Sequence, residues 1–78
     1  MAPMSSVSSA HIRFGQRIRN LRSTRGFTQE TLASKIGVDR SYMGFLERGE
    51  RNPSLEVILK IAKALNVDPD ELVKDLNT

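Results

Sequence analysis

The side chains best suited to chemistry lie between residues 40 and 48, where arginines alternate with a hydroxyl, a glycine and an aromatic ring. Drawn as a helix at about 100° per residue, this segment places those residues on one arc, opposite Tyr42, Met43 and Leu46. An arginine fork can donate to O6 and N7 of guanine, a serine can bond a base edge, and an apolar group can meet a thymine methyl. The arc predicts a helix that reads the major groove of DNA, with base contacts from Arg40, Ser41, Gly44 and Phe45.

Residues on either side of this helix are candidates for holding the DNA backbone. Thr28 and Gln29 begin a shorter helix, whose free amides and positive dipole end suit a phosphate. Arg51 and Asn52 follow the reading helix at the expected height of the backbone, and Arg48 could serve phosphate rather than base. We therefore predict that these five residues contact phosphates.

Each of these side chains also has a purely structural interpretation. Gln29 could brace the reading helix instead, and Phe45 could fold back onto the core, because an exposed phenylalanine costs solubility. For Glu47 we favour the structural interpretation, a salt bridge with an arginine of the first helix. Residues 1–51 carry a net charge of +5 and residues 52–78 carry −2. This asymmetry suits a chain that faces a polyanion on one side, but arginines that only solvate the first helix would give the same count.

Five helical segments are predicted to carry these residues. Apolar residues at helical spacing, with capping residues before them, place helices over 11–25, 29–36, 40–48, 55–65 and from Asp68 onward. The three residues 37–39 join the second and third segments as in a helix-turn-helix. We expect an all-α domain over residues 11–78, preceded by a flexible, serine-containing tail over residues 1–10.

Composition argues against several other functions. There is no cysteine, and one histidine without a carboxylate pair leaves no arrangement for nucleophilic catalysis or metal binding. We therefore expect neither an enzyme nor a cofactor. No apolar run reaches the roughly 20 residues of a membrane helix, and the first ten residues lack the features of a signal peptide. We expect a cytoplasmic protein without a membrane partner.

The fourth and fifth helices carry more apolar surface than one small core needs. The helix expected over residues 55–65 carries apolar side chains around most of its circumference, and only a glutamate and two lysines indicate a solvent-exposed face. A domain of this size is marginally stable, so pairing would be a natural source of stability. We expect a homodimer whose interface includes Val57, Ile61, Leu72 and Leu76.

Four motifs follow one another in order: TQETLA over residues 28–33, GVDRSY over 37–42, LERG over 46–49 and RNPSL over 51–55. Together they resemble the phage-repressor-like (Cro/C1, XRE-type) helix-turn-helix family, and the resemblance covers about residues 12–76. It implies a five-helix, lambda-repressor-like domain that binds double-stranded DNA. The helix-turn-helix would be formed by the second and third helices.

Within that family the chain is most similar to the controller proteins of restriction-modification systems, through residues 39–42, Glu47-Arg48 and Arg51-Asn52. Those proteins are homodimers that bind palindromic operators and regulate their own promoter and the endonuclease gene. The similarity implies that Arg40 and Ser41 read bases, that Tyr42 helps to hold deformed DNA and that Gln29 touches phosphate. Ser41 replaces the more usual threonine, which leaves the base preference open.

Two other functions remain open for the same fold. The chain could be a phage-type repressor, or an antitoxin or other protein-interaction module. Glu30 lies near the position that some phage repressors use to touch RNA polymerase, so a polymerase contact is a further candidate.

Overall fold

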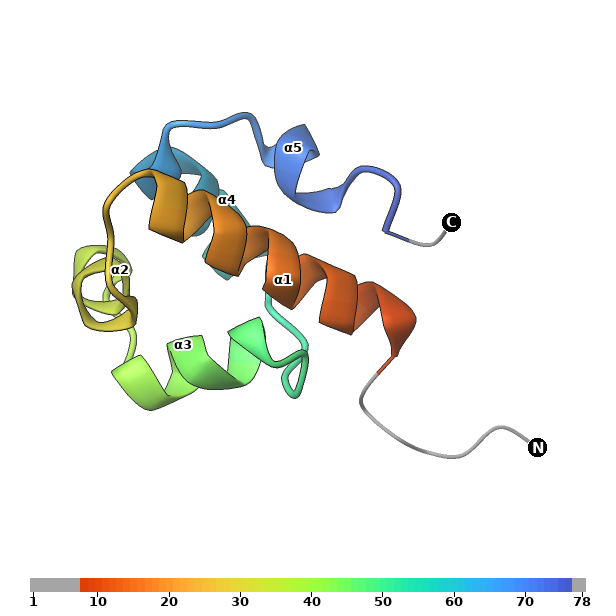
Figure 1. Ribbon diagram of the computed structural model, residues 1–78, viewed down its shortest axis with the longest axis horizontal. Helices are drawn as coiled ribbons and strands as arrows, with labels where there is room; N and C mark the ends of the chain where they lie inside the picture. The colour runs from red at the N-terminus through yellow and green to blue at the C-terminus, as the bar shows by residue number, and fades with distance from the viewer. Residues whose placement is uncertain (1–7, 77–78) are drawn as a thin grey trace.

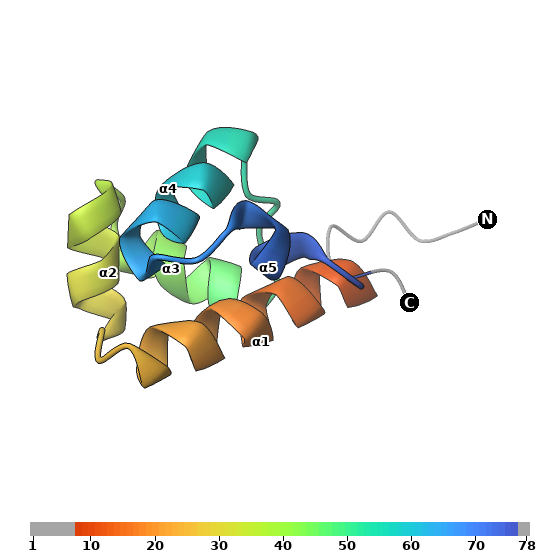
Figure 2. The same ribbon diagram turned by 90° about the horizontal axis from the view of Figure 1, so that it is seen from above.

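The computed structural model describes residues 8–76, and these form five helices and no strand. The helices are α1 (Ser9–Thr24), α2 (Gln29–Ile36), α3 (Arg40–Glu47), α4 (Leu55–Leu65) and α5 (Pro69–Val73). In Figure 1, α1 crosses the middle of the domain, with α3 below it and α5 above it. Helix α2 closes one end, seen along its axis in Figure 1 and from its side in Figure 2. The all-α prediction is confirmed.

Capping residues set most of the helix ends. Thr28 and Ser54 accept hydrogen bonds from the backbone amides of Thr31 (3.0 Å) and Val57 (3.1 Å), and α2 and α4 begin where the sequence predicts. Helix α1 begins at Ser9, two residues earlier than expected, because the Ser8 side chain accepts from the His11 amide at 3.2 Å. Ser9 and Ala10 thus lie in α1 and Ser8 caps it, where the sequence predicts a tail, and the rest of the expected tail, residues 1–7, lies outside the described part.

The turn between α2 and α3 depends on the backbone of Gly37. This residue has φ 78°, in the left-handed region that favours glycine. The amide of Val38 then donates to the carbonyl of Ala33 at 2.9 Å, which closes the end of α2. Asp39 begins α3 without a side-chain capping bond, so this end of α3 keeps free amides.

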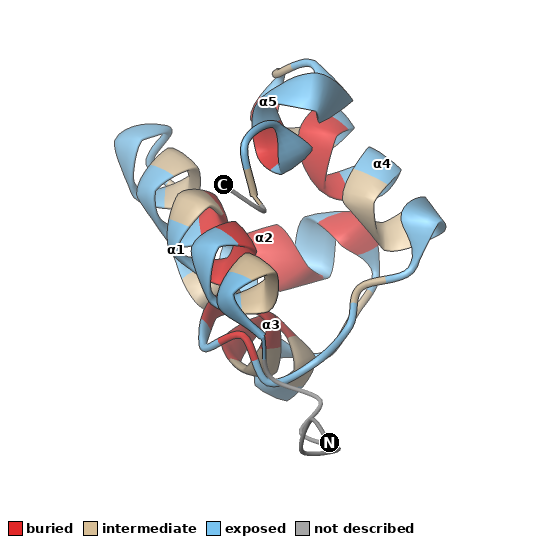
Figure 3. Cartoon of the chain, turned by 90° about the vertical axis from the view of Figure 1, so that its right-hand side faces the viewer, coloured by how far each residue is buried: buried red, intermediate tan, exposed pale blue. Residues whose placement is uncertain are grey.

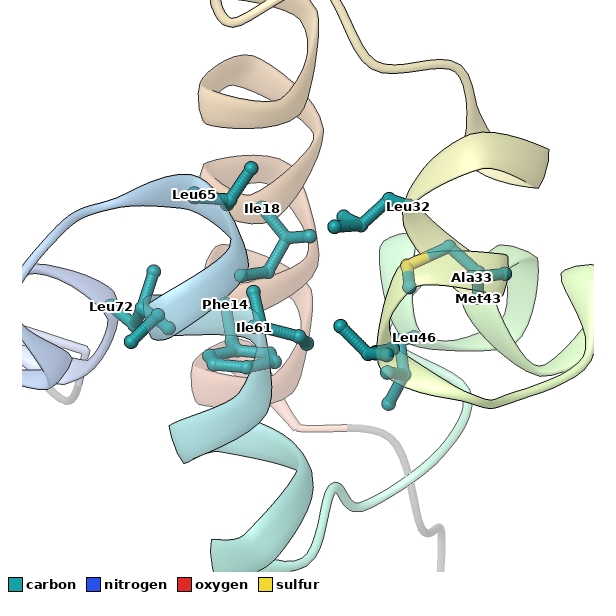
Figure 4. Close-up of a cluster of buried hydrophobic side chains, with 11 residues drawn as sticks. Phe14, Ile18, Leu32, Ala33, Met43, Leu46, Ile61, Leu65 and Leu72 are labelled. Atoms are coloured by element: carbon teal, nitrogen blue, oxygen red, sulfur yellow. The ribbon is translucent and has the colours of Figure 1, made fainter.

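All five helices contribute to one core. Figure 4 shows the central side chains converging between α1, α2 and α4, and Figure 3 shows the buried positions on the inward faces of the helices. The core consists of Phe14, Ile18, Leu32, Ala33, Ile36, Met43, Leu46, Ile61, Ala62, Leu65 and Leu72. Helix α3 packs against α1 and α2, α2 packs also against α4, and α5 packs against α4 and α1.

The core corrects part of the expected dimer interface. Ile61 and Leu72 are 0% exposed, so both pack inside a single chain and cannot face a second copy. Val57 and Leu76 are partly buried and pack against the same core. The exposed apolar side chains of α4 are instead Leu55 and Leu59, which lie one helical turn apart.

Candidate nucleic-acid interface

The first turn of α3 presents two of the four residues that the sequence predicts as base contacts. Arg40 and Ser41 are both exposed at the N-terminal end of this helix. The other side of α3 is held by Met43 and Leu46, which are buried in the core. Because these anchors fix the rotation of α3, Arg40 and Ser41 lie on its outward side, as the sequence predicts, whereas Gly44 does not. Arg40 and Ser41 are free to meet another molecule.

A buried carboxylate ties α3 to α1 and α2. The side chain of Glu47 is 2% exposed and accepts from Nε and Nη2 of Arg22 at 2.5 and 3.2 Å. It also accepts from Nε2 of Gln29 at 3.0 Å. The expected salt bridge between Glu47 and an arginine of the first helix is thus present. Arg22 also donates to the carbonyl of Phe27 at 2.8 Å, so it links three helices to the loop before α2.

The start of α2 combines a side-chain capping box with free backbone amides. The Thr28 hydroxyl bonds the amide and the hydroxyl of Thr31, whose own hydroxyl accepts from the Thr28 amide at 2.8 Å. This box engages the amide and the hydroxyl of Thr28, which stays exposed, and its contact with phosphate remains a prediction. The next two amides, of Gln29 and Glu30, have no partner within the helix, as is usual at the first turn. The Gln29 amide group has two N–H donors, and only one is needed by Glu47.

A cluster of charged side chains surrounds Phe45 near the end of α3. The Cζ atoms of Arg48 and Arg51 lie 5.2 and 4.7 Å from the centre of its ring. Nε of Arg48 also pairs with Oε1 of Glu50 at 3.2 Å. This arrangement leaves Phe45 half-buried beneath its own arginines instead of folded onto the core.

Gly44 also differs from the expectation. It is buried, and a Cβ atom built on it would lie 3.2 Å from Nη1 of Arg48. The missing side chain therefore makes room for the Arg48 guanidinium, and Gly44 is not open to a base while Arg48 lies there. Asn52 is exposed in the loop that follows, and Tyr42 is half-buried against the core.

Two arginines of α1 bind backbone carbonyls of α5 and of the residues that follow it. Nη1 of Arg13 donates to the carbonyl of Leu76 at 2.8 Å, and Nη1 of Arg17 donates to the carbonyls of Glu71 and Lys74 at 3.3 and 2.6 Å. Such cations satisfy carbonyls that the end of a helix leaves without partners. The positive charge of the first 51 residues is thus divided between the α2–α3 surface and the attachment of α5.

Other kinds of site find little support in residues 8–76. No group of three or more histidine, aspartate or glutamate side chains there is placed to hold a metal ion. No helix in the same part of the chain is long and apolar enough to span a membrane.

Known proteins share this arrangement. A helix-turn-helix family model matches residues 18–72. The solved restriction-modification controller protein C.AhdI from Aeromonas hydrophila is 54% identical, with a TM-score of 0.81 over 83% of this chain and 98% of its own. The control protein C.BamHI of Bacillus amyloliquefaciens is 42% identical over 86% of this chain and 84% of its own. SinR of Bacillus subtilis, solved in complex with DNA, is 35% identical, with a TM-score of 0.75 over 78% of this chain and 98% of its own.

Proposed function

This chain belongs to the helix-turn-helix family of XRE-type DNA-binding transcriptional regulators, and from that premise we propose that it controls a restriction-modification system. In this proposal it binds a near-palindromic operator in double-stranded DNA as a homodimer. The observation that carries the proposal is the pair Arg40 and Ser41, exposed on the first turn of a helix whose opposite face is locked in the core.

Base reading is assigned to the first turn of α3. The guanidinium of Arg40 can donate to both acceptors of one guanine, and the hydroxyl of Ser41 can bond the neighbouring base edge. The brace from Gln29 to Glu47 at 3.0 Å supports this role, because it fixes the angle between α2 and α3 before DNA arrives. The operator half-site is therefore read by side chains whose backbone is already in position.

Backbone contacts are assigned to the two ends of this unit. The backbone amides of Gln29 and Glu30 at the start of α2, together with the second N–H of the Gln29 side chain, would hold one phosphate. Arg48, Arg51 and Asn52 would hold phosphates beyond the end of α3, and the hydroxyl of Tyr42 is a further donor. Such contacts position the protein without reading sequence.

The dimer is assigned to the exposed side of α4. Leu55 and Leu59 are 71% and 47% exposed and form an apolar strip that Glu56, Lys60 and Lys63 flank. Opposite charges beside an apolar strip are complementary to a second copy turned by a twofold axis, because Glu56 can then face a lysine of the other chain. A twofold pair would place its recognition helices one DNA turn apart, about 34 Å.

The controller role is supported by similarity. C.AhdI and C.BamHI are named as controllers of restriction-modification systems, and both match this chain over more than four fifths of their length. A controller that also activates would need a polymerase contact, for which the exposed Glu30 in the first turn of α2 is the candidate.

The test is selection of a duplex from a random pool by the purified protein, followed by affinity measurements over a range of salt. We expect a near-palindrome, and a log-log slope of about −0.9 for each phosphate neutralised. The same sequence should occur upstream of the gene for this protein and beside an endonuclease gene. A slope near zero would contradict DNA binding, and a selected site away from any endonuclease gene would contradict the controller role.

A further inference from the structure

Phe45 is the only aromatic ring on the outward side of α3, and two cations cover it. The Cζ atoms of Arg51 and Arg48 lie 4.7 and 5.2 Å from the ring centre, within the roughly 6 Å over which a ring face attracts a guanidinium. A ring covered in this way is poorly placed to meet a thymine methyl. The geometry therefore argues against the direct base contact that the sequence suggests for Phe45.

Three features near the ring keep the two like charges together. Glu50 pairs with Arg48 at 3.2 Å and offsets the repulsion between the guanidiniums. The amide of Glu50 donates to the carbonyl of Phe45 at 2.9 Å, which folds the chain back at the end of α3. Gly44 has no side chain where the Arg48 guanidinium lies. The arrangement is thus built from the backbone as well as from the side chains.

We infer that Phe45 is a positioning residue for DNA binding, whose ring holds Arg48 and Arg51 ready for the phosphates beside the recognition helix. The inference rests on the proposed DNA-binding function. Ordering a long side chain on binding has an entropic cost, so arginines that are ordered beforehand bind more tightly. A guanidinium held by its flat face can still donate to a phosphate through its N–H edge. In Arg48, where Nε donates to Glu50, the donors for a phosphate are the two Nη groups.

The experiment is a mutant cycle on two duplexes of equal length, the one selected by the wild-type protein and a random one, at fixed salt. Phe45→Leu keeps an apolar side chain but removes the ring, and Phe45→Tyr keeps the ring. We expect Phe45→Leu to weaken binding roughly five- to tenfold for a dimer on both duplexes, and Phe45→Tyr to stay within about twofold of wild type. In an Arg48→Ala, Arg51→Ala background, Phe45→Leu should cost less than about twofold.

Two results would overturn the inference. A loss from Phe45→Leu that persists at full size without the arginines would show that the ring acts on DNA by itself. An equal loss for Phe45→Tyr and Phe45→Leu would show that the ring face is not what matters. Replacing thymine by deoxyuridine in the selected duplex completes the test, because a methyl contact predicts a loss there and a positioning role predicts none.

Two controls separate a loss of folding stability from a loss of DNA binding. Urea midpoints should agree among the Phe45 variants, and Phe45→Met serves as a second apolar variant if Phe45→Leu unfolds more easily. A wild-type protein that selects no duplex would contradict the proposed function itself. Normal selection without coupling between Phe45 and the arginines would contradict only the role inferred for the ring.

Discussion

Replacing Arg22 by methionine should destabilise the domain more than any change on its surface. The side chains of Arg22 and Glu47 are 13% and 2% exposed, so their ion pair is largely shielded from water. Arg22→Met removes two donors to Glu47 and leaves its carboxylate with the single bond from Gln29. Breaking a buried pair in this way costs about 3–5 kcal/mol, because one charge stays buried without its partner.

This loss is large against the whole stability of the domain. At about 0.05–0.15 kcal/mol per residue, a chain of this length has roughly 4–12 kcal/mol in total. The thermal midpoint should fall by at least about 12 °C, since each kcal/mol is worth about 4–8 °C in a domain of this size. Urea unfolding followed by circular dichroism, at two protein concentrations to account for pairing, would measure the free energy.

A control and a second variant make the reasoning refutable. Arg48→Met breaks the pair with Glu50, whose side chains are 55% and 45% exposed, and should cost no more than about 1 kcal/mol. Adding Glu47→Leu to Arg22→Met removes the stranded charge and should recover part of the loss. Equal costs for Arg22→Met and Arg48→Met, or a double variant no more stable than Arg22→Met, would refute the account of this ion pair.

Three further variants test the packing, the dimer and the phosphate contacts. Gly15→Ala should lower the free energy of unfolding in urea by about 1–3 kcal/mol, because the added Cβ would overlap carbonyl oxygens at the end of α3. The control Gln16→Ala, at the exposed neighbouring position, should leave it almost unchanged. Leu59→Asp should give a monomer in sedimentation at about ten micromolar, because it places a charge on the exposed apolar strip of α4. The control Asn20→Asp, at an exposed position of α1, should remain a dimer at that concentration. A dimer of Leu59→Asp would show that the interface lies on another surface. Gln29→Ala keeps the backbone amide but removes the side-chain N–H that is left over from the bond to Glu47, so it should weaken binding to the operator and to random duplex almost equally. A loss confined to the operator would mean that Gln29 serves base reading, either directly or through its bond to Glu47.

The helices were predictable where local signals determine them. The bounds of α2 and α4 follow from Thr28 and Ser54, whose hydroxyls cap the backbone within three residues. The start of α1 was less predictable, because Ser8 lies among other serines that could equally cap a helix. A capping residue can be identified from the sequence only when few neighbouring residues could also cap the helix.

The candidate site was predictable in its residue types more than in its contacts. A partner for Glu47 on the first helix could be expected from charge, but the choice of Arg22 depends on how α1 crosses α3. Ile61 was placed in the dimer interface because α4 is apolar on more than one side, and periodicity does not say which side faces the core. The stack of Arg51 on Phe45 joins residues six apart across the end of a helix, where helical spacing no longer applies.

The most direct test of the central claim is the base preference of Arg40→Ala. Arg40 is exposed at the first position of α3, and a bidentate contact to guanine is worth about 1–3 kcal/mol of discrimination. Binding would be measured to the selected operator and to all of its single-base variants, with Arg19→Ala, an exposed arginine of α1, as the control for lost charge. The account predicts that Arg40→Ala loses about that amount per half-site and relaxes preference at one base pair in each half, while Arg19→Ala keeps the wild-type ranking. An Arg40→Ala protein that ranks the base variants as the wild type does would contradict the assignment of the first turn of α3 as the reading surface.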